Sequence, residues 1–275
     1  MSAKPKLGLT SYSYHLAAST YLKESHYGRE GVSWLLDQVK ALDLDGVQLG
    51  GGEVDIAQIT EFRTGGDRER YLEVAMGTWT DEELRQWLGV SRDAGARGLR
   101  AMLSYEPLAW THFEEDRAML MRHLEKAATM AEEFGVPLAL ENHSDYAAWQ
   151  IAELLRDLQS PHVGVCFDSG NPPSSFEHPV DAARSVAPFV YQTHLRDFKI
   201  VHADYGIRYE GVPLGQGVVD VEEVVRILRA ESPAEAFSVE SAVRADPRKS
   251  AEENLQYEEE GARQSIEFAR TRLGL

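Results

Sequence analysis

The sequence predicts an α/β protein, a single (β/α)8 TIM barrel that spans residues 1–275 as one domain. Short apolar runs with β-branched residues, typical of strands, alternate with segments whose apolar residues recur at helical spacing. About eight such pairs can be counted, and strict alternation predicts a parallel sheet that eight units close into a barrel. The 275 residues also match the typical size of such a barrel, about 250 residues.

The predicted strands are runs of four to six mostly apolar residues, as expected for strands buried on both faces. Two long loops, at residues 13–31 and 104–115, are expected after the first and fourth strands. The strands themselves are expected at residues 7–12, 46–50, 71–76, 98–103, 137–142, 163–168, 190–195 and 236–240.

The predicted helices are recognised by apolar residues three or four apart and by their capping residues. Thr80, Asp220 and Ser250 each precede a glutamate by three positions, the pattern of a helix N-terminus. Gly135 and Pro161 are expected helix stops. The helices are expected near residues 32–42, 56–62, 80–88, 116–134, 147–158, 180–186, 220–228 and 250–272.

Each of the last four strands ends in a side chain that can bind a metal. The carboxyl ends of barrel strands meet on the face where barrel active sites lie, and an unpaired buried charge is unfavourable. Three carboxylates and one imidazole suit Mn²⁺, the expected ion, and also Mg²⁺, Co²⁺ or Zn²⁺. Each residue alone could be a strand-end side chain bonded to loop backbone, so the prediction of one divalent ion depends on the whole set. The four predicted ligands are Glu141, Asp168, His194 and Glu240.

Composition narrows the class of protein. The formal net charge of −17 disfavours a nucleic-acid partner, because affinity for a phosphate backbone comes from Lys and Arg. Cys166 is the single cysteine, which excludes an internal disulfide framework and indicates a reducing, cytoplasmic setting. The chain has neither an apolar run of the ~20 residues needed to span a membrane nor the apolar core of a signal peptide, so no membrane partner is expected.

Five motifs carry a resemblance to a known family: LENH at 140–143, FDSGN at 167–171, THLRDF at 193–198, GVPLGQGVVD at 211–220 and SVES at 238–241. Over nearly its whole length the chain resembles the sugar phosphate isomerase/epimerase superfamily, the xylose isomerase-like TIM barrels. The resemblance implies a metal-dependent enzyme with a small carbohydrate substrate. It does not select one reaction, since such barrels include ketose 3-epimerases, hydroxypyruvate isomerases, inosose and 3-dehydroshikimate dehydratases and deglycosylating lyases.

A DNA-repair endonuclease with three metal ions belongs to the same superfamily. That branch needs further His and Glu ligands on the second to fourth strands. Here the second strand ends in Leu49-Gly50-Gly51 and the third in Met76-Gly77. The missing ligands and the acidic charge both disfavour nuclease activity.

The reaction shared by such enzymes starts with removal of a proton from a carbon next to a carbonyl, and three residues are candidates to move it. As in the epimerases that the chain resembles, Glu141 or Glu240 could be metal ligand and base together. His143 lies two residues beyond Glu141 and so points to the same side of an extended strand. We favour His143 as the general base, although it could instead orient Glu141.

Three further residues are candidates to bind the substrate. Asn171 could hold a hydroxyl, or it could cap the turn before Pro172. Arg196 shares the orientation of His194 and could bind a substrate oxygen. His112 lies in the long loop after the fourth strand and could line the pocket. The glycine-rich segment 211–217 has no Lys or Arg, which favours a turn over a phosphate site.

The leading interpretation is a divalent-metal-dependent isomerase or epimerase of a small sugar or keto-sugar that acts through enolisation. The alternative is a metal-dependent lyase or dehydratase on a 3-keto sugar, an oxidised glycoside or a cyclitol. A carbohydrate-binding protein on an inactive barrel is disfavoured because all four predicted ligands are present. Barrels of this family often associate, so we also expect a homo-oligomer or a companion subunit.

Overall fold

The centre of the structure, a computed structural model, is a closed barrel of eight parallel strands with neighbours in the order β1-β10-β7-β6-β5-β4-β3-β2. The described residues are 4–17, 32–50, 52 and 54–275. The barrel confirms the predicted (β/α)8 fold. Its strands are β1 (Lys6–Thr10), β2 (Gly46–Gly50), β3 (Tyr71–Ala75), β4 (Leu99–Ala101), β5 (Leu138–Glu141), β6 (Val163–Asp168), β7 (Val190–Leu195) and β10 (Ala236–Val239).

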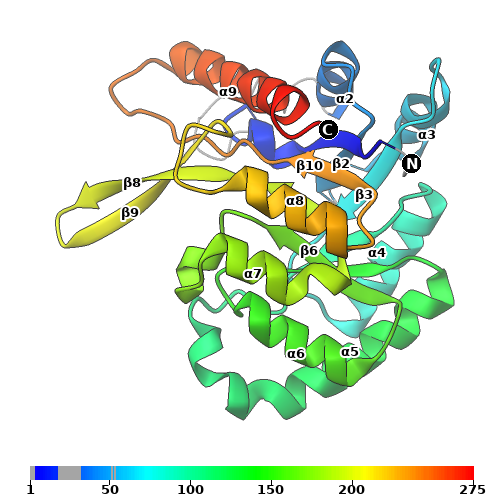
Figure 1. Ribbon diagram of the computed structural model, residues 1–275. Helices are drawn as coiled ribbons and strands as arrows, with labels where there is room; N and C mark the ends of the chain where they lie inside the picture. The colour runs from blue at the N-terminus through cyan, green and yellow to red at the C-terminus, as the bar shows by residue number, and fades with distance from the viewer. Residues whose placement is uncertain (1–3, 18–31, 51, 53) are drawn as a thin grey trace.

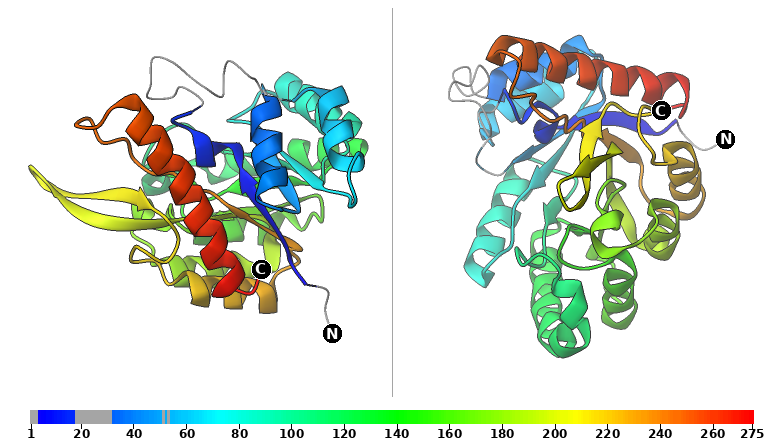
Figure 2. Two further views of the ribbon diagram at one scale, coloured as in Figure 1. Left: turned by 90° about the horizontal axis from the view of Figure 1, so that it is seen from above. Right: turned by 90° about the vertical axis from the view of Figure 1, so that its left-hand side faces the viewer.

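Helices surround the barrel (Figures 1 and 2). The predicted caps are present: Thr80 and Ser250 form capping boxes, and Gly135 ends a helix with a positive φ of 66°. Among the described residues no helix has the length and apolar character needed to cross a bilayer. The helices are α2 (Val32–Ala41), α3 (Ile56–Thr64), α4 (Asp81–Asp93), α5 (Phe113–Phe134), α6 (Ala148–Leu158), α7 (Pro179–Val186), α8 (Val221–Glu231) and α9 (Ala251–Thr271).

Several boundaries differ from the prediction, and two of them adjoin the expected long loops. The first strand ends at Thr10 rather than at residue 12, because the chain turns into a short 3-10 helix, Ser11–Tyr14, above the barrel. Helix α5 begins at Phe113, three residues before the expected start, and shortens the loop predicted at 104–115. Most of the other predicted long loop, at 13–31, lies outside the described residues.

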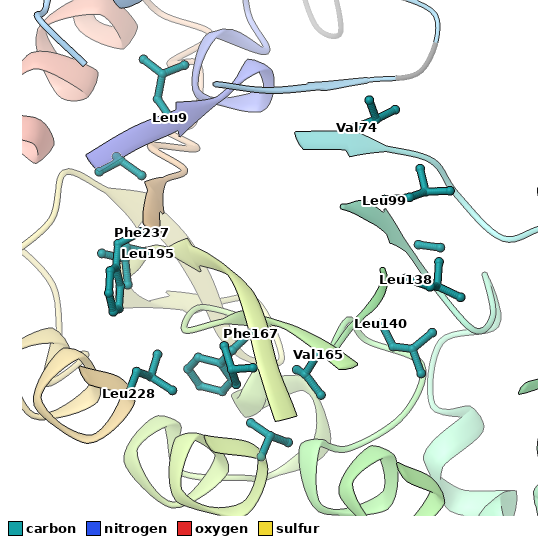
Figure 3. Packing of buried hydrophobic residues seen from close by; sticks show 14 of the residues in the cluster. Leu9, Val74, Leu99, Leu138, Leu140, Val165, Phe167, Leu195, Leu228 and Phe237 are labelled. Carbon is teal, nitrogen blue, oxygen red and sulfur yellow. The ribbon is translucent and has the colours of Figure 1, made fainter. Parts of the chain in front are cut away.

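The hydrophobic core lies between the outer face of the barrel and the helices. Alternate strand residues such as Leu9, Val74, Leu138, Phe167 and Phe237 point outward into this layer and are almost completely buried (Figure 3). Burial of each large apolar side chain contributes roughly 1.5–3 kcal/mol. This outer layer therefore supplies most of the hydrophobic stabilisation and leaves the inner face available for polar residues.

The inner face of the barrel is polar, which differs from the expectation of apolar runs on both faces. Gln48 on β2 bonds Gln192 and His194 on β7, and the hydroxyl of Tyr71 on β3 lies 3.0 Å from that of Ser238 on β10. These strand pairs are not neighbours in the barrel, so the bonds cross its interior. These bonds satisfy several of the buried polar groups, as buried polar groups generally require.

An antiparallel hairpin projects from the barrel after β7 (Figures 1 and 2). Its strands, β8 (Asp197–Ala203) and β9 (Gly206–Val212), were not predicted. The following segment is a turn, as favoured for 211–217. It wraps around the buried Asp197 carboxylate, which accepts hydrogen bonds from the N–H groups of Phe198, Gly215, Gly217 and Val219 at 2.8–3.0 Å. This carboxylate ties both ends of the inserted segment to the rim of the barrel.

Candidate active site and metal centre

The structure brings the four predicted metal ligands together at the carboxyl end of the barrel. Nδ1 of His194 lies 3.4 Å from Oε1 of Glu141, 3.8 Å from Oδ2 of Asp168 and 3.2 Å from Oε2 of Glu240. All four residues are buried. Strand pairing explains why these side chains lie close together, because His194 is in register with both Asp168 on β6 and Ser238 on β10.

The environment of His194 fits a metal ion. Its Nε2 lies 2.8 Å from Oε1 of Gln48, while its buried Nδ1 has no hydrogen-bond partner among the described residues. A buried nitrogen that faces three carboxylates and makes no hydrogen bond has the position of a metal ligand. One donor atom each from Glu141, Asp168 and His194 lies within 4.8 Å of the others, close enough for one cation to bind all three.

Arg196 and Asn171, both predicted to bind substrate, lie beside the ligands. Nη1 of Arg196 donates to Oδ2 of Asp168 at 3.0 Å and to Oδ1 of Asn171 at 3.1 Å. The amide of Asn171 donates to Oε1 of Glu141 at 3.3 Å. Burial raises the pKa of Asp168, but the guanidinium of Arg196, the imidazole of His194 and the N–H of Gly170 together outweigh burial and lower that pKa to about 2. Asp168 is therefore ionised, as a metal ligand must be.

Arg100 is a site residue that the sequence interpretation missed. It lies on β4, its Nη2 forms an ion pair with Oε2 of Glu141, and its Nη1 donates to the carbonyl of Met76 at 2.9 Å. The signal was present in the sequence, since a charged residue in the middle of the apolar run at 98–103 has to face a polar partner. The side chain of β4 that points into the barrel therefore belongs to the site.

His143 lines the same cavity as the ligands and is half-buried. Its Nδ1 lies 3.2 Å from the hydroxyl of Ser144. Burial lowers the pKa of the imidazole below its ordinary value, which favours the neutral form that can accept a proton. The hydrogen bonds of the described residues include none between this ring and the Glu141 carboxylate, so the alternative role of orienting Glu141 gains no support.

His112 is not brought to the site. It ends the short 3-10 helix Ala109–His112, its side chain is 61% exposed, and its Nδ1 lies 3.7 Å from a carboxylate oxygen of Glu115. It is absent from the cavity lining. His112 is the N-cap residue of α5, so it lies at a helix end rather than within the long loop that was expected.

The cavity above the ligands has a volume of about 710 Å³. Its polar lining includes the predicted ligands other than Asp168, together with Arg100 and Arg196. Its wall includes Trp87 and Glu83 of α4 and the apolar side chains of Met76 and Met102. A cavity of this size, with a few converging polar groups, suits a small polar molecule.

A model of the family described as xylose isomerase-like TIM barrel matches residues 79–272. Two curated relatives are distant. The chain is 23% identical over 183 residues to the uncharacterized protein YihM of Escherichia coli, an alignment covering 65% of this chain and only 54% of YihM. It is 24% identical over 204 residues to a 3-oxo-isoapionate decarboxylase of Pectobacterium atrosepticum, covering 73% of this chain and 71% of the relative.

Solved structures share the fold at low identity. D-psicose 3-epimerase of Clostridium cellulolyticum, solved with D-tagatose, matches with a TM-score of 0.70 at 16% identity over 98% of this chain and 99% of its own. A probable 3-DHS dehydratase, AsbF from Bacillus anthracis, matches with a TM-score of 0.70 at 14% identity over 97% of this chain and 99% of its own. Barrels of this shape are thus found in both an epimerase and a probable dehydratase.

Proposed function

This chain belongs to the xylose isomerase-like TIM-barrel family, and on that premise we propose that it is a divalent-metal-dependent isomerase or epimerase of a small sugar or keto-sugar. The observation that carries the proposal is the position of His194. Its Nδ1, which makes no hydrogen bond to the described residues, lies 3.2–3.8 Å from carboxylate oxygens of three other residues. A divalent ion would satisfy all four side chains.

The ion would be held by the four predicted ligands, with Mn²⁺ as the expected metal. A bound divalent cation stabilises negative charge that develops on a carbonyl oxygen when the neighbouring carbon loses a proton. The residues that would hold it are Glu141, Asp168, His194 and Glu240.

The chain's own residues would position the substrate and move the proton. Arg196 and Asn171 bond each other at 3.1 Å and line the cavity, so their remaining donors can orient substrate oxygens. His143, neutral because burial lowers its pKa, is the proposed general base. Glu141 and Glu240 are the alternative bases, although coordination to a metal weakens the basicity of a carboxylate.

A lyase is the second candidate, and the two arginines of the site favour it. Arg100 is ion-paired with Glu141, and Arg196 with Asp168. With a divalent ion bound, three carboxylates and two guanidiniums leave a net charge of +1, which can balance one negative charge on the substrate: a carboxylate before CO₂ is lost, or the enolate that follows. The likeness to a decarboxylase supports this candidate, since loss of CO₂ from a 3-keto acid also passes through an enolate.

One experiment distinguishes the two candidates. The purified protein, loaded in turn with Mn²⁺, Mg²⁺, Co²⁺ or Zn²⁺, is incubated in D₂O with ketoses, 3-keto sugars and 3-keto sugar acids. An isomerase or epimerase gives deuterium at the α-carbon and a rearranged sugar, whereas a lyase gives an unsaturated product or CO₂. If the protein shows no deuterium uptake and forms no product with any of the metals, both candidates are rejected.

A further inference from the structure

A chain of buried polar residues lies beneath the predicted metal ligands, inside the barrel. Gln48 on β2 lies between His194 on β7 and Glu73 on β3. Glu73 in turn pairs with Nε of Arg97 at 3.0 Å, just before β4. Gln48, Glu73 and His194 are each at most 3% exposed, so water does not replace these contacts. The function proposed above assigns no role to Gln48 or Glu73.

The neighbours of the Gln48 amide determine which way it points. Its Nε2 donates to Oε2 of Glu73 and to Oε1 of Gln192, each at 3.3 Å. If the amide were reversed, its oxygen would face these two oxygens and neither bond could form. Gln192 could reverse its own amide to compensate, but the Glu73 carboxylate, which is ion-paired with Arg97, offers only acceptors. Glu73 is therefore the group that fixes the orientation.

The orientation of Gln48 in turn determines the tautomer of His194. With its nitrogen directed to Glu73, Gln48 presents Oε1 to Nε2 of His194 at 2.8 Å. An oxygen acceptor at this distance requires a hydrogen on Nε2. The lone pair of the neutral ring is then on Nδ1, the atom that faces Glu141, Asp168 and Glu240. Metal-binding histidines commonly have their other ring nitrogen held in this manner.

We propose that Glu73 is a positioning residue that, through Gln48, fixes the Nε2–H tautomer of His194 and leaves Nδ1 free to bind the metal. The proposal rests on the metal site of the proposed function. It adds that Glu73, which contacts none of the four predicted metal ligands directly, supports metal binding through Gln48. Arg97 supports that role by neutralising the buried carboxylate from the side away from Gln48.

The test is Zn²⁺ affinity in the absence of substrate, measured by competition with a chelating dye. Glu73→Gln keeps the size of the side chain but introduces an amide that can donate to a reversed Gln48. Loss of such a supporting partner typically costs about 10–100-fold in metal affinity, and we expect a loss of this size. The double variant Glu73→Gln/Gln48→Glu restores a fixed acceptor toward Nε2, so we expect its affinity to return to within about threefold of wild type.

The matched control is Tyr71→Phe, which removes a hydroxyl that lies 3.0 Å from that of Ser238 in the same barrel interior without touching the Gln48 contacts. Its Zn²⁺ affinity should remain that of wild type. NMR of the Zn²⁺-loaded protein with ¹⁵N-labelled histidine should show a slowly exchanging Nε2–H of His194 in wild type and in the double variant, but not in Glu73→Gln.

The following results distinguish failure of this inference from failure of the proposed function. Unchanged affinity in Glu73→Gln, or a double variant no better than the single one, overturns the inference while the metal site stands. A wild-type protein that binds no divalent ion overturns the proposed function and the inference with it. If Glu73→Gln does not fold, Gln48→Met, which removes the acceptor itself, carries the same expected loss.

Discussion

Oε2 of Glu240 lies 3.2 Å from Nδ1 of His194 and accepts a hydrogen bond from the hydroxyl of Thr10 at 3.1 Å. Thr10 ends the first barrel strand, β1, and Glu240 follows the last, β10, so this hydrogen bond spans the point where the barrel closes. The fourth predicted ligand is thus held in place by the closure of the barrel.

The first prediction separates metal binding from proton transfer. Glu240→Gln replaces a charged ligand and should lower metal content, whereas His143→Ala leaves all four ligands in place and should keep it. Each should lower kcat by at least about 10²-fold, the usual scale for loss of an acid–base group. Metal analysis after gel filtration measures the first effect. Exchange of the substrate's α-proton in D₂O measures the second.

His112→Ala is the matched control for that prediction. His112 is 61% exposed on its side chain and does not line the cavity, so both metal content and exchange should stay at wild-type values. If His143→Ala exchanges the α-proton at the wild-type rate, the base is a glutamate and the assignment of His143 is wrong.

The second prediction concerns Arg100. Its ion pair with the buried Glu141 neutralises a carboxylate to which the described residues offer no second arginine or lysine until a metal binds. Arg100→Met should therefore lower the free energy of unfolding of the metal-free protein by about 3–5 kcal/mol, the usual cost of an unpaired buried charge. Saturation with Mn²⁺ should reduce this loss, because the cation neutralises Glu141 in its place. Equal losses with and without metal in urea unfolding would contradict this role.

The third prediction concerns the glycines under Tyr71. A Cβ at Gly46 would lie 2.3 Å from the ring of Tyr71, which fills the barrel interior between β1 and β3. Gly46→Ala should lower the free energy of unfolding by about 1–3 kcal/mol through overpacking. Gly89→Ala on α4, where the nearest atom is 3.5 Å away, should be neutral or slightly stabilising. Thermal unfolding of both variants gives the comparison; a Gly46→Ala protein as stable as wild type would show that the ring moves freely.

The fourth prediction is a pH dependence of stability centred on Glu258. Its carboxylate accepts the N–H groups of Leu16 and Ala17 at 2.6 and 3.0 Å, but burial outweighs these bonds and raises its pKa from 4.5 to about 7. A raised folded-state pKa contributes stability that is complete below pH 4.5 and is lost as the pH rises through about 7. The loss amounts to at most about 3 kcal/mol.

Glu258→Gln removes this titration. Across that pH window the free energy of unfolding of the variant should therefore rise relative to wild type, whatever constant cost the amide adds. Glu259→Gln, at an exposed neighbouring position, should keep the wild-type slope. Urea unfolding at several pH values measures both, and parallel curves for wild type and Glu258→Gln would refute the assignment.

The sequence was sufficient for the barrel and for the clustering of the four predicted ligands because both follow from local pattern. Strand–helix alternation implies the topology, and topology alone brings Glu141, Asp168, His194 and Glu240 to one face. The polar interior was less predictable: the run at 46–50 marks Gln48 as a strand residue, but which residue it meets across the barrel depends on strand register and barrel closure.

Loop-borne features were predicted least well. His112 was assigned to the pocket from its place in a long loop, but position in a loop does not show which way a side chain points. The β8–β9 hairpin was missed although Phe198, Ile200, Ile207 and Tyr209 alternate around a turn, a recognisable hairpin signal. The expected homo-oligomer or companion subunit stays a prediction, since a single chain contains no interface that could test it.

Four backbone N–H groups bonded to Asp197 hold the base of the β8–β9 hairpin in place beside the candidate site. Because the anchor lies at its base, the tip at 203–206 can lengthen, shorten or change sequence while Arg196 keeps its place beside Asp168. Descendants of this barrel could therefore acquire new binding surfaces by altering the hairpin alone. The same turn is the natural place for a protein engineer to insert a peptide or a reporter domain.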